Sequence, residues 1–382
     1  MATGRRYGIK RTPVFPIWAI LGGSVVVALI GSYPMYGEQY VVSLLGMFLT
    51  FSIFALSIDL IWGFAGILSL GQAVYFGIGA YFVALSLKIR YALEHPTRYG
   101  GTIPDFMEWN GLTELPGFME PLTSLWFAVA LALFVPTLLA FIFGFVTFKR
   151  RIYGVYCAVI TLAEALILQE AIIEYQPYTG GFNGVTDYSN YANMYFLWFI
   201  LAVTVLCYAV GRALTHSRVG TILKSVRDND MRAEFMGYNV ANYRIFVFCL
   251  SSFMAAAAGA MYAAWMGIVS FLDTGPIFSI EAVIWTAVGG RGTIIGAFVG
   301  TFLVKGAEFF LSDIMAWTWQ LLMGALFIFV VLVMRDGIVG TIGKWLGRRR
   351  PGSLVQLAEE ADAMAKDKQK DYRPAGGVTE EI

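Results

Sequence analysis

Charged residues are scarce in this sequence of 382 residues. Asp, Glu, Lys and Arg make up 14% of it, whereas soluble domains carry about 25%. The formal net charge is +1, so a general electrostatic attraction to nucleic acid is excluded. Histidine occurs only as His95 and His216, and the three cysteines show no C-x-x-C spacing. We therefore expect neither a metal site nor a disulfide framework.

Nucleotide-binding motifs are also missing from the sequence. Gly343-Lys344 resembles the end of a P-loop, but Ile338 stands where that motif needs Gly and Trp345 where it needs Ser or Thr. Gly290-Arg-Gly292 begins like a dinucleotide fingerprint, but Ile295 occupies the third glycine position. The sequence also shows no nucleophile–base pair. We therefore expect no catalytic residue and no cofactor in this chain, and we expect that the chain alone is not an enzyme.

Long apolar runs recur from Phe15 to Met334. A hydrocarbon core about 30 Å thick requires about 20 apolar helical residues, and continuous runs favour helices over the alternating strands of a barrel. We predict an all-α polytopic membrane protein with about ten transmembrane helices. The candidate spans are 15–34, 41–62, 66–88, 122–147, 153–174, 194–212, 243–268, 277–290, 293–311 and 316–334, of which 277–290 is the shortest.

The basic residues indicate the orientation of these spans. If the N-terminus lies inside, most of the 27 Lys and Arg residues fall in inside segments, and the outside segments hold only Lys88, Arg90 and Arg98. This asymmetry favours an even number of crossings with both termini cytoplasmic. The predicted organisation is a cytoplasmic N-terminus at 1–14, a transmembrane domain at 15–335 with an external loop at 89–121 and a cytoplasmic loop at 213–242, and a cytoplasmic, largely flexible tail at 336–382.

The cytoplasmic loop contains the most informative polar segment. Residues 219–236 fit a short amphipathic helix, in which Asp228 and Arg232 are spaced to form an ion pair. Gly237 suits the end of that helix, where a positive φ favours glycine. Such a helix is typical both of a docking site for a partner protein and of a segment lying on lipid headgroups.

This segment resembles the coupling segment of permease subunits from branched-chain amino acid ABC transporters. Two further segments are similar to glycine motifs of the same family: Leu56–Tyr81, with Gln72 where the family more often has His, and Ala287–Gly300. Phe235 departs from the family's usual Ala. On this resemblance we assign ATPase coupling to Arg227, Asp228, Asn229, Arg232, Ala233, Glu234 and Gly237.

The resemblance implies the ABC importer permease fold in a bacterial inner membrane, crossed many times. It also implies a second homologous permease subunit forming a hetero-dimer, two cytosolic subunits that bind ATP and Mg, and an external substrate-binding protein. Some details, such as Asp59 before Trp62-Gly63 and the segment Thr179–Asp187, resemble the urea-type subunit. We therefore expect import of urea or short amides. Branched-chain or other amino acids are the alternative within the family, and a secondary transporter or channel without ATPase is the alternative from another class.

Polar residues inside the predicted spans are candidates for the translocation pathway. A charge at mid-bilayer costs roughly 2.5–3.5 kcal/mol and therefore usually faces protein or water. Glu164 lies near the middle of its span with Thr161 on the same helical stripe, although a buried structural acid would look the same. Together with Gln72 and Asp59 these residues form the candidate set, and Asp59 also lies close enough to a span end to cap it.

Glycines at helical spacing indicate close packing. Gly292, Gly296 and Gly300 are four residues apart, which lets two membrane helices approach closely. The glycines between Gly63 and Gly79 indicate either a broken helix beside a pathway or close packing.

Overall fold

The computed structural model describes residues 39–95, 103–188 and 191–315, six positions between 318 and 328, and 337–341. Within these residues the regular structure is helical, apart from one antiparallel bridge between Val185 and Val269. Six helices are long and apolar enough to cross a membrane, or seven crossings result if the bent pair α12–α13 counts as one. The all-helical prediction is confirmed for this part of the chain. The predicted span 15–34, most of 316–334 and the tail beyond 341 lie outside the described residues.

The long helices follow the apolar runs of the sequence. They are α2 (Gln39–Ile58), α3 (Gln72–Glu94), α5 (Leu125–Lys149), α6 (Val155–Glu174), α8 (Met194–His216), α11 (Val240–Met266), α12 (Pro276–Gly289) and α13 (Ile294–Met315). The short elements are η2 (Asp59–Phe64), α4 (Asp105–Trp109), η3 (Glu120–Thr123), α7 (Gln176–Thr179), η4 (Gly181–Asn183), α9 (Arg218–Asp228), α10 (Asp230–Phe235) and η5 (Phe271–Thr274).

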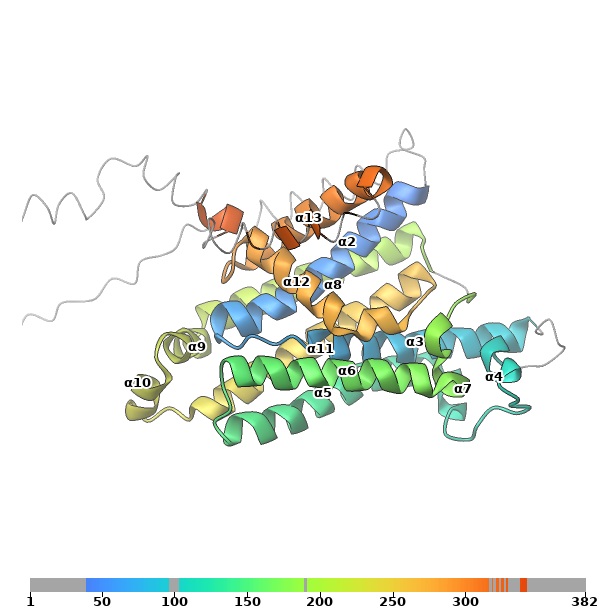
Figure 1. Ribbon diagram of the computed structural model, residues 1–382, viewed down its shortest axis with the longest axis horizontal. Helices are drawn as coiled ribbons and strands as arrows, with labels where there is room; N and C mark the ends of the chain where they lie inside the picture. The colour runs from blue at the N-terminus through green and yellow to red at the C-terminus, as the bar shows by residue number, and fades with distance from the viewer. Residues whose placement is uncertain are drawn as a thin grey trace, which may run out of the picture. The chain divides into compact units, whose positions relative to one another are not determined.

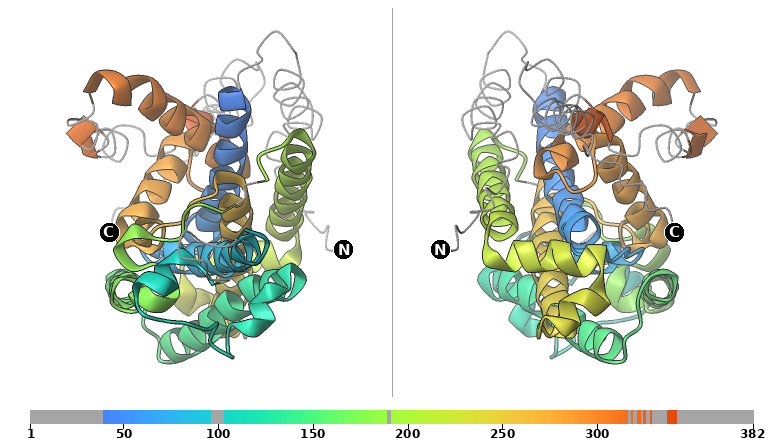
Figure 2. Two further views of the ribbon diagram at one scale, coloured as in Figure 1. Left: turned by 90° about the vertical axis from the view of Figure 1, so that its right-hand side faces the viewer. Right: turned by 90° about the vertical axis from the view of Figure 1, so that its left-hand side faces the viewer.

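Helices α2, α3 and α11 form the centre of the bundle, and their side chains are mostly buried. Gly79 of α3 and Gly259 of α11 lie directly against the backbone of the opposite helix, because a Cβ at either position would overlap it. Helix α2 lies between α8 on one side and α12 and α13 on the other (Figure 2). Helices α5, α6 and α8 instead expose many large apolar side chains. Such a surface is typical of contact with lipid or with a partner subunit.

The helix of the predicted span 66–88 starts later in the chain than expected. The π-helical turn η2 follows α2, and the chain is then not helical from Ala65 to Gly71. Gly66 has a φ of 75°, which side chains other than glycine rarely adopt. Helix α3 therefore begins at Gln72 rather than at residue 66, which agrees with the broken-helix alternative.

Helices α12 and α13 are joined by a sharp bend of 112°. Gly296 and Gly300 of α13 lie against the backbone of α12, where a Cβ at Gly300 would overlap the carbonyl oxygen of Trp285. Gly292 differs from the prediction: it precedes α13 in the turn and has a φ of 74°. It therefore belongs to the bend and not to the helical packing face.

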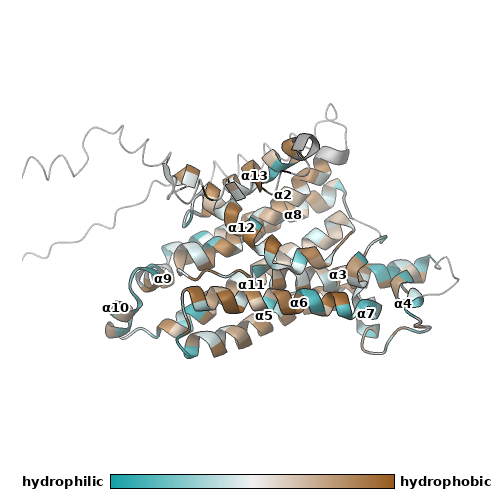
Figure 3. Ribbon diagram, in the orientation of Figure 1, coloured by the Kyte–Doolittle hydropathy of each residue, from teal (hydrophilic) through white to brown (hydrophobic). Residues whose placement is uncertain are grey.

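The bundle has two polar ends, which Figure 3 shows in teal. Helices α9 and α10, from the predicted cytoplasmic loop, lie at one end, and α4 and α7, from the predicted external loops, lie at the other (Figure 1). Arg151 and Glu234 form an ion pair of 3.3 Å at the first end, and Lys88 and Asp105 form one of 3.3 Å at the second. Each end thus collects segments that the positive-inside analysis places on the same side.

Candidate functional site

The predicted coupling segment folds as two helices rather than one. Asn229 interrupts the segment with φ −164° and ψ 101°, and its Oδ1 accepts a hydrogen bond of 2.9 Å from the Arg232 N–H. It thereby caps the N-terminus of α10, a position that Asn favours. The single helix predicted over 219–236 was wrong. The predicted pairing of Asp228 with Arg232 was also wrong, because Asp228 instead lies 3.1 Å from the guanidinium of Arg227.

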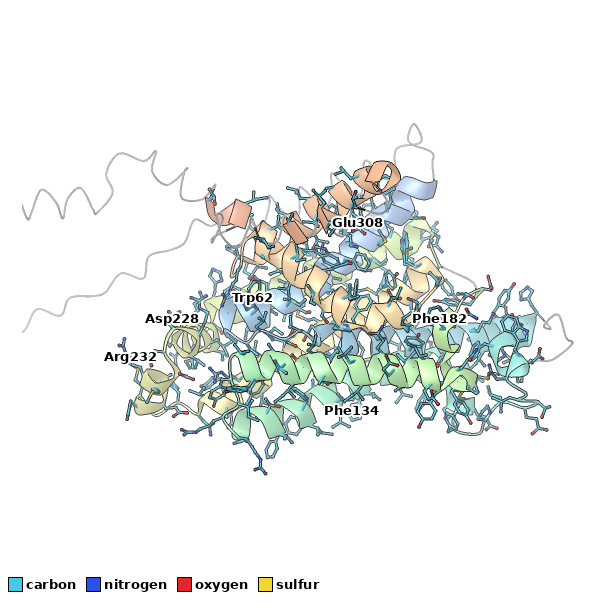
Figure 4. All side chains as sticks on the ribbon, viewed as in Figure 1. Trp62, Phe134, Phe182, Asp228, Arg232 and Glu308 are labelled. Carbon is cyan, nitrogen blue, oxygen red and sulfur yellow. The ribbon has the colours of Figure 1, made fainter. Side chains whose placement is uncertain are left out.

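The two helices present one buried face and one exposed face. Leu223 and Val226 of α9 and Ala233 of α10 are buried against the bundle. On the other side of α10, Met231 and Phe235 are 68% and 87% exposed. Figure 4 marks Asp228 and Arg232 at this end of the molecule.

We call Met231, Phe235 and Met236, which is 67% exposed, the coupling patch. The sequence analysis missed this patch as a feature, although it noted Phe235 as unusual. The available signal was spacing: Met231 and Phe235 are four residues apart, and Ala233, two residues from each, lies on the opposite face of the helix. Exposed apolar side chains clustered in a polar segment are typical of a protein interface.

The C-terminal end of α9 is bound to the transmembrane helices. Arg227 Nη1 donates a hydrogen bond of 2.6 Å to the carbonyl oxygen of Gly63, at the end of η2. Asp59, also in η2, accepts a 2.6 Å hydrogen bond from the Gly292 N–H in the α12–α13 bend. We call Asp59, Gly63, Arg227 and Gly292 the inner junction. It joins three segments that are far apart in the sequence.

Arg291 reinforces the same region. Its guanidinium donates to the Trp62 carbonyl oxygen at 3.2 Å and lies 4.7 Å from the centre of the Trp62 ring. The positive charges of Arg227 and Arg291 both act on the Asp59 carboxylate, which is fully buried. These charges offset part of the cost of burying the acid, while Asp59 Oδ2 has no hydrogen-bond partner among the described residues.

Helix α10 has two further attachments to the bundle. Asp230 lies 3.4 Å from Arg244 near the start of α11, and Arg244 stacks on the Tyr153 ring at 3.8 Å. Glu234 pairs with Arg151 in the turn between α5 and α6. Arg227 and Glu234, both assigned to coupling, and their neighbour Asp230 therefore attach α9 and α10 to η2, to the α5–α6 turn and to α11, while the coupling patch stays exposed.

Three of the four pathway candidates lie around the non-helical segment 65–71. Thr161 Oγ1 accepts a 3.0 Å hydrogen bond from the Leu70 N–H, and Gln72 Nε2 donates to Ser251 Oγ at 2.8 Å. The Tyr75 hydroxyl donates to the Glu164 carboxylate at 3.1 Å. Asp59 is not part of this group, since it belongs to the inner junction.

The sequence analysis did not single out Lys305. Its Nζ lies 3.3 Å from Glu281 of α12 and 2.7 Å from Glu308, three residues further along α13. Periodicity places Lys305 and Glu308 on one face but gives no sign of Glu281, because Glu281 and Lys305 meet only through the α12–α13 bend. Within the described residues, no group of His, Cys, Asp or Glu is placed to hold a metal ion.

Comparison with known proteins matches residues 40–331 to the family described as the branched-chain amino acid transport system / permease component. The chain is 22% identical to the high-affinity branched-chain amino acid transport system permease protein LivM of Salmonella typhimurium, over 81% of this chain and 72% of that protein. It is 21% identical to LivM of Escherichia coli, over 86% of this chain and 78% of that protein. It is also 24% identical to the ribose import permease protein RbsC of Haemophilus influenzae, over 60% and 71% of the two chains.

No solved structure matches the chain. The family match covers most of the sequence and contains the inner junction, the coupling segment and the α12–α13 bend. The chain therefore belongs to the permease components of branched-chain amino acid transport systems, and is a multi-pass membrane permease subunit of a bacterial ABC importer rather than an enzyme.

Proposed function

We propose that this subunit imports a branched-chain or other amino acid, and that separate ATPase subunits drive it by binding α10. The observation that carries the coupling proposal is the exposed coupling patch, held at the same end of the bundle as the inner junction. A secondary transporter or channel would have no need for such a patch. The ATPases, and not this chain, bind ATP and Mg.

The inner junction supports a route from the ATPases to the membrane spans. The helix α9 holds the end of η2 through Arg227, and η2 holds the α12–α13 bend through Asp59. The π-helical turn η2 leads directly into the non-helical stretch 65–71, and the other contacted segment is the α12–α13 bend, so both lie where backbone angles change most easily. ATP binding moves α9 and α10, and the junction passes that movement to α12 and α13, which favours one arrangement of the spans over another.

The relatives support the amino acid substrate over urea. The two LivM proteins are named for branched-chain amino acids and match more than four-fifths of this chain. The features that favoured urea are short, and none of the matched proteins reported above is named for it. The family is also broad, since a ribose import permease matches 60% of the chain.

The remaining partners follow from the two ends of the bundle. A second permease subunit would cover apolar faces of the outer helices, where α5, α6 and α8 expose large side chains. An external binding protein would dock at the opposite end from the coupling patch, where Phe118 and Phe182 are 68% and 70% exposed.

The test is transport by the assembled complex in proteoliposomes. We expect ATP-dependent uptake of labelled leucine when the binding protein is present, and little uptake of labelled urea. Replacing Phe235 by Asp places a charge in the interface with the ATPase and should lower leucine-stimulated ATP hydrolysis about tenfold or more. Phe235→Leu keeps the apolar contact and serves as the matched control.

Two results would contradict these proposals separately. Leucine uptake that persists without ATP would overturn the ATP-driven mechanism. Uptake of urea but not leucine would overturn the amino acid assignment while leaving the coupling role of α10 intact.

A further inference from the structure

A cluster of three charged side chains lies deep within the membrane-spanning part of the chain. Lys305 lies about three turns beyond the start of α13, which is about 16 Å along the helix axis from the bend. A hydrocarbon core is about 30 Å thick, so a helix that enters it at the bend and runs along the membrane normal places Lys305 near its middle. Lys305 Nζ pairs there with Glu281 at 3.3 Å and with Glu308 at 2.7 Å. Figure 4 marks Glu308 on α13.

Within the part of the chain that the structure describes, the cluster is only partly covered. The side chain of Lys305 is 11% exposed, whereas those of Glu281 and Glu308 are 31% and 28% exposed. Partly exposed carboxylates at this depth are stable against protein or water but not against lipid tails. The face of α12 and α13 that carries the two glutamates therefore borders an aqueous path or protein other than the described residues.

Aromatic rings lie beneath the cation. Lys305 Nζ is 4.9 Å from the centre of the Trp285 ring and 5.4 Å from that of Phe51. Trp285 is fully buried, and its Nε1 has no hydrogen-bond partner among the described residues. A buried N–H without an acceptor is unfavourable, so the indole of Trp285 is a donor available to a ligand.

The charges in the cluster suit a zwitterion better than a neutral solute. Lys305 has one positive charge and three N–H donors, but two carboxylate partners. One glutamate is therefore available for a second cation while the other stays with Lys305. Urea carries no charge and would gain nothing from an exchange of ion pairs.

We propose that Lys305, Glu281, Glu308 and Trp285 form a contact site for the main-chain groups of an amino acid during its passage. Lys305 and the Trp285 N–H bind the carboxylate, and Glu281 or Glu308 binds the ammonium. The substrate replaces one internal ion pair with two external ones, so total charge in the site does not change. This inference rests on the proposed function, because it assumes an amino acid substrate.

The test compares leucine with leucinamide, which keeps the ammonium but lacks the carboxylate. In the reconstituted complex, Lys305→Gln should lower ATP-dependent leucine uptake about tenfold or more, since a charge-assisted contact is lost. The variant should also lose the wild-type preference for leucine over leucinamide as a competitor. Lys149→Gln is the matched control, because Lys149 also lies over an aromatic ring, Phe145, but on the outer helix α5.

A second variant guards against a simple loss of folding. Trp285→Phe keeps the aromatic ring and removes only the N–H, so it should raise the leucine concentration that gives half-maximal uptake while the complex still assembles. Unchanged leucine uptake in this variant and in Lys305→Gln would overturn the inference. Full recovery of leucine uptake in a charge-swapped pair, Lys305→Glu with Glu281→Lys, would also overturn it, because a structural ion pair tolerates the exchange.

These outcomes are separate from the failure of the proposed function. Leucine uptake without ATP that still depends on Lys305 would overturn the ATP-driven mechanism and support the site. ATP-dependent leucine uptake that ignores Lys305 would overturn the site alone. Uptake of urea but not leucine would overturn both the amino acid assignment and this site.

Discussion

Several polar residues in the spans accept hydrogen bonds from backbone N–H groups at the starts and breaks of helices. Ser279 Oγ accepts from the Ala73 N–H at 2.8 Å, and Thr161 does the same for Leu70. Asp59 accepts from Gly292 in the bend. Since lipid offers no partners, every exposed N–H and C=O at these breaks needs one from the protein. The same residues that permit the breaks therefore also hold them in one arrangement.

Asp273 of η5 provides a residue-scale prediction about pH. Its carboxylate accepts hydrogen bonds from the backbone N–H and the hydroxyl of Ser270, at 2.8 Å and 3.2 Å. Burial raises the pKa of Asp273 to about 6, although the Ser270 hydrogen bonds and the charge of Lys305 lower it in part. An unfolded chain has an Asp pKa of about 3.9, so the folded state holds this proton more tightly. The free energy of unfolding should therefore fall as pH rises from about 4 to about 6, by about 3 kcal/mol at most.

The measurement is the Tm of the detergent-solubilised protein across that pH range. The fall in Tm should be smaller in Asp273→Asn than in the wild type, because the titrating group is gone. Asp228→Asn removes an exposed carboxylate and should leave the wild-type slope in place. Equal slopes in the wild type and Asp273→Asn would show that this carboxyl does not contribute.

At the scale of elements, the bent pair α12–α13 combines tight packing with a hinge. Gly296 and Gly300 bring α13 onto the backbone of α12, while Gly290 and Gly292 adopt positive φ in the bend. The positive φ values are therefore confined to the bend, and the two helices beyond it pack against each other as regular helices. This geometry suits a pair that responds to a contact at the inner junction.

Gly300 and Gly306 offer a matched test of this packing on one helix. A Cβ at Gly300 would overlap the Trp285 carbonyl oxygen, whereas a Cβ at Gly306 would meet nothing within 4 Å. Gly300→Ala should lower the stability by roughly 1–3 kcal/mol because backbone must move. Gly306→Ala should be neutral or raise stability by about 0.5–1 kcal/mol, as alanine favours the helix. Thermal unfolding of the two variants checks this, and equal Tm values would contradict the close approach of α12 and α13.

At the scale of the whole molecule, the described bundle separates two functions at its ends. The coupling patch and the inner junction lie at one end, and the segments joined by the Val185–Val269 bridge and the Lys88–Asp105 ion pair lie at the other. The spans between them carry the charged cluster around Lys305. If ATPase subunits act on α9 as proposed, their signal has to travel only from α9 to the bend, and not across the full bundle.

The sidedness of the two ends is directly measurable. Met236 and Phe118 have nearly equal exposure, 67% and 68%, but lie at opposite ends. In a background without the native cysteines, a membrane-impermeant maleimide added to intact cells should label Phe118→Cys but not Met236→Cys. Lysis should make Met236→Cys reactive. Labelling of both variants in intact cells would contradict the predicted orientation.

For the described residues, the sequence by itself determined the helical class, most span boundaries and the family, and it singled out the segment for which we propose a coupling role. Long apolar runs indicate membrane spans, and the asymmetry of Lys and Arg between loops indicates their orientation. Both are local properties of the chain. Gly66 and Asn229 show the limit of such patterns, because apolar or amphipathic periodicity continues through both positions while the helix does not.

Only the tertiary structure decided which polar residues meet. Asp59 and Gly292, Arg227 and Gly63, and Lys305 and Glu281 are separated in sequence but brought together by the breaks in η2 and between α12 and α13. The periodicity of the sequence places each residue on one face of its own helix, but it does not say which other helix that face will contact. The physical reason is that packing between helices depends on bends and close approaches that several distant glycines set together.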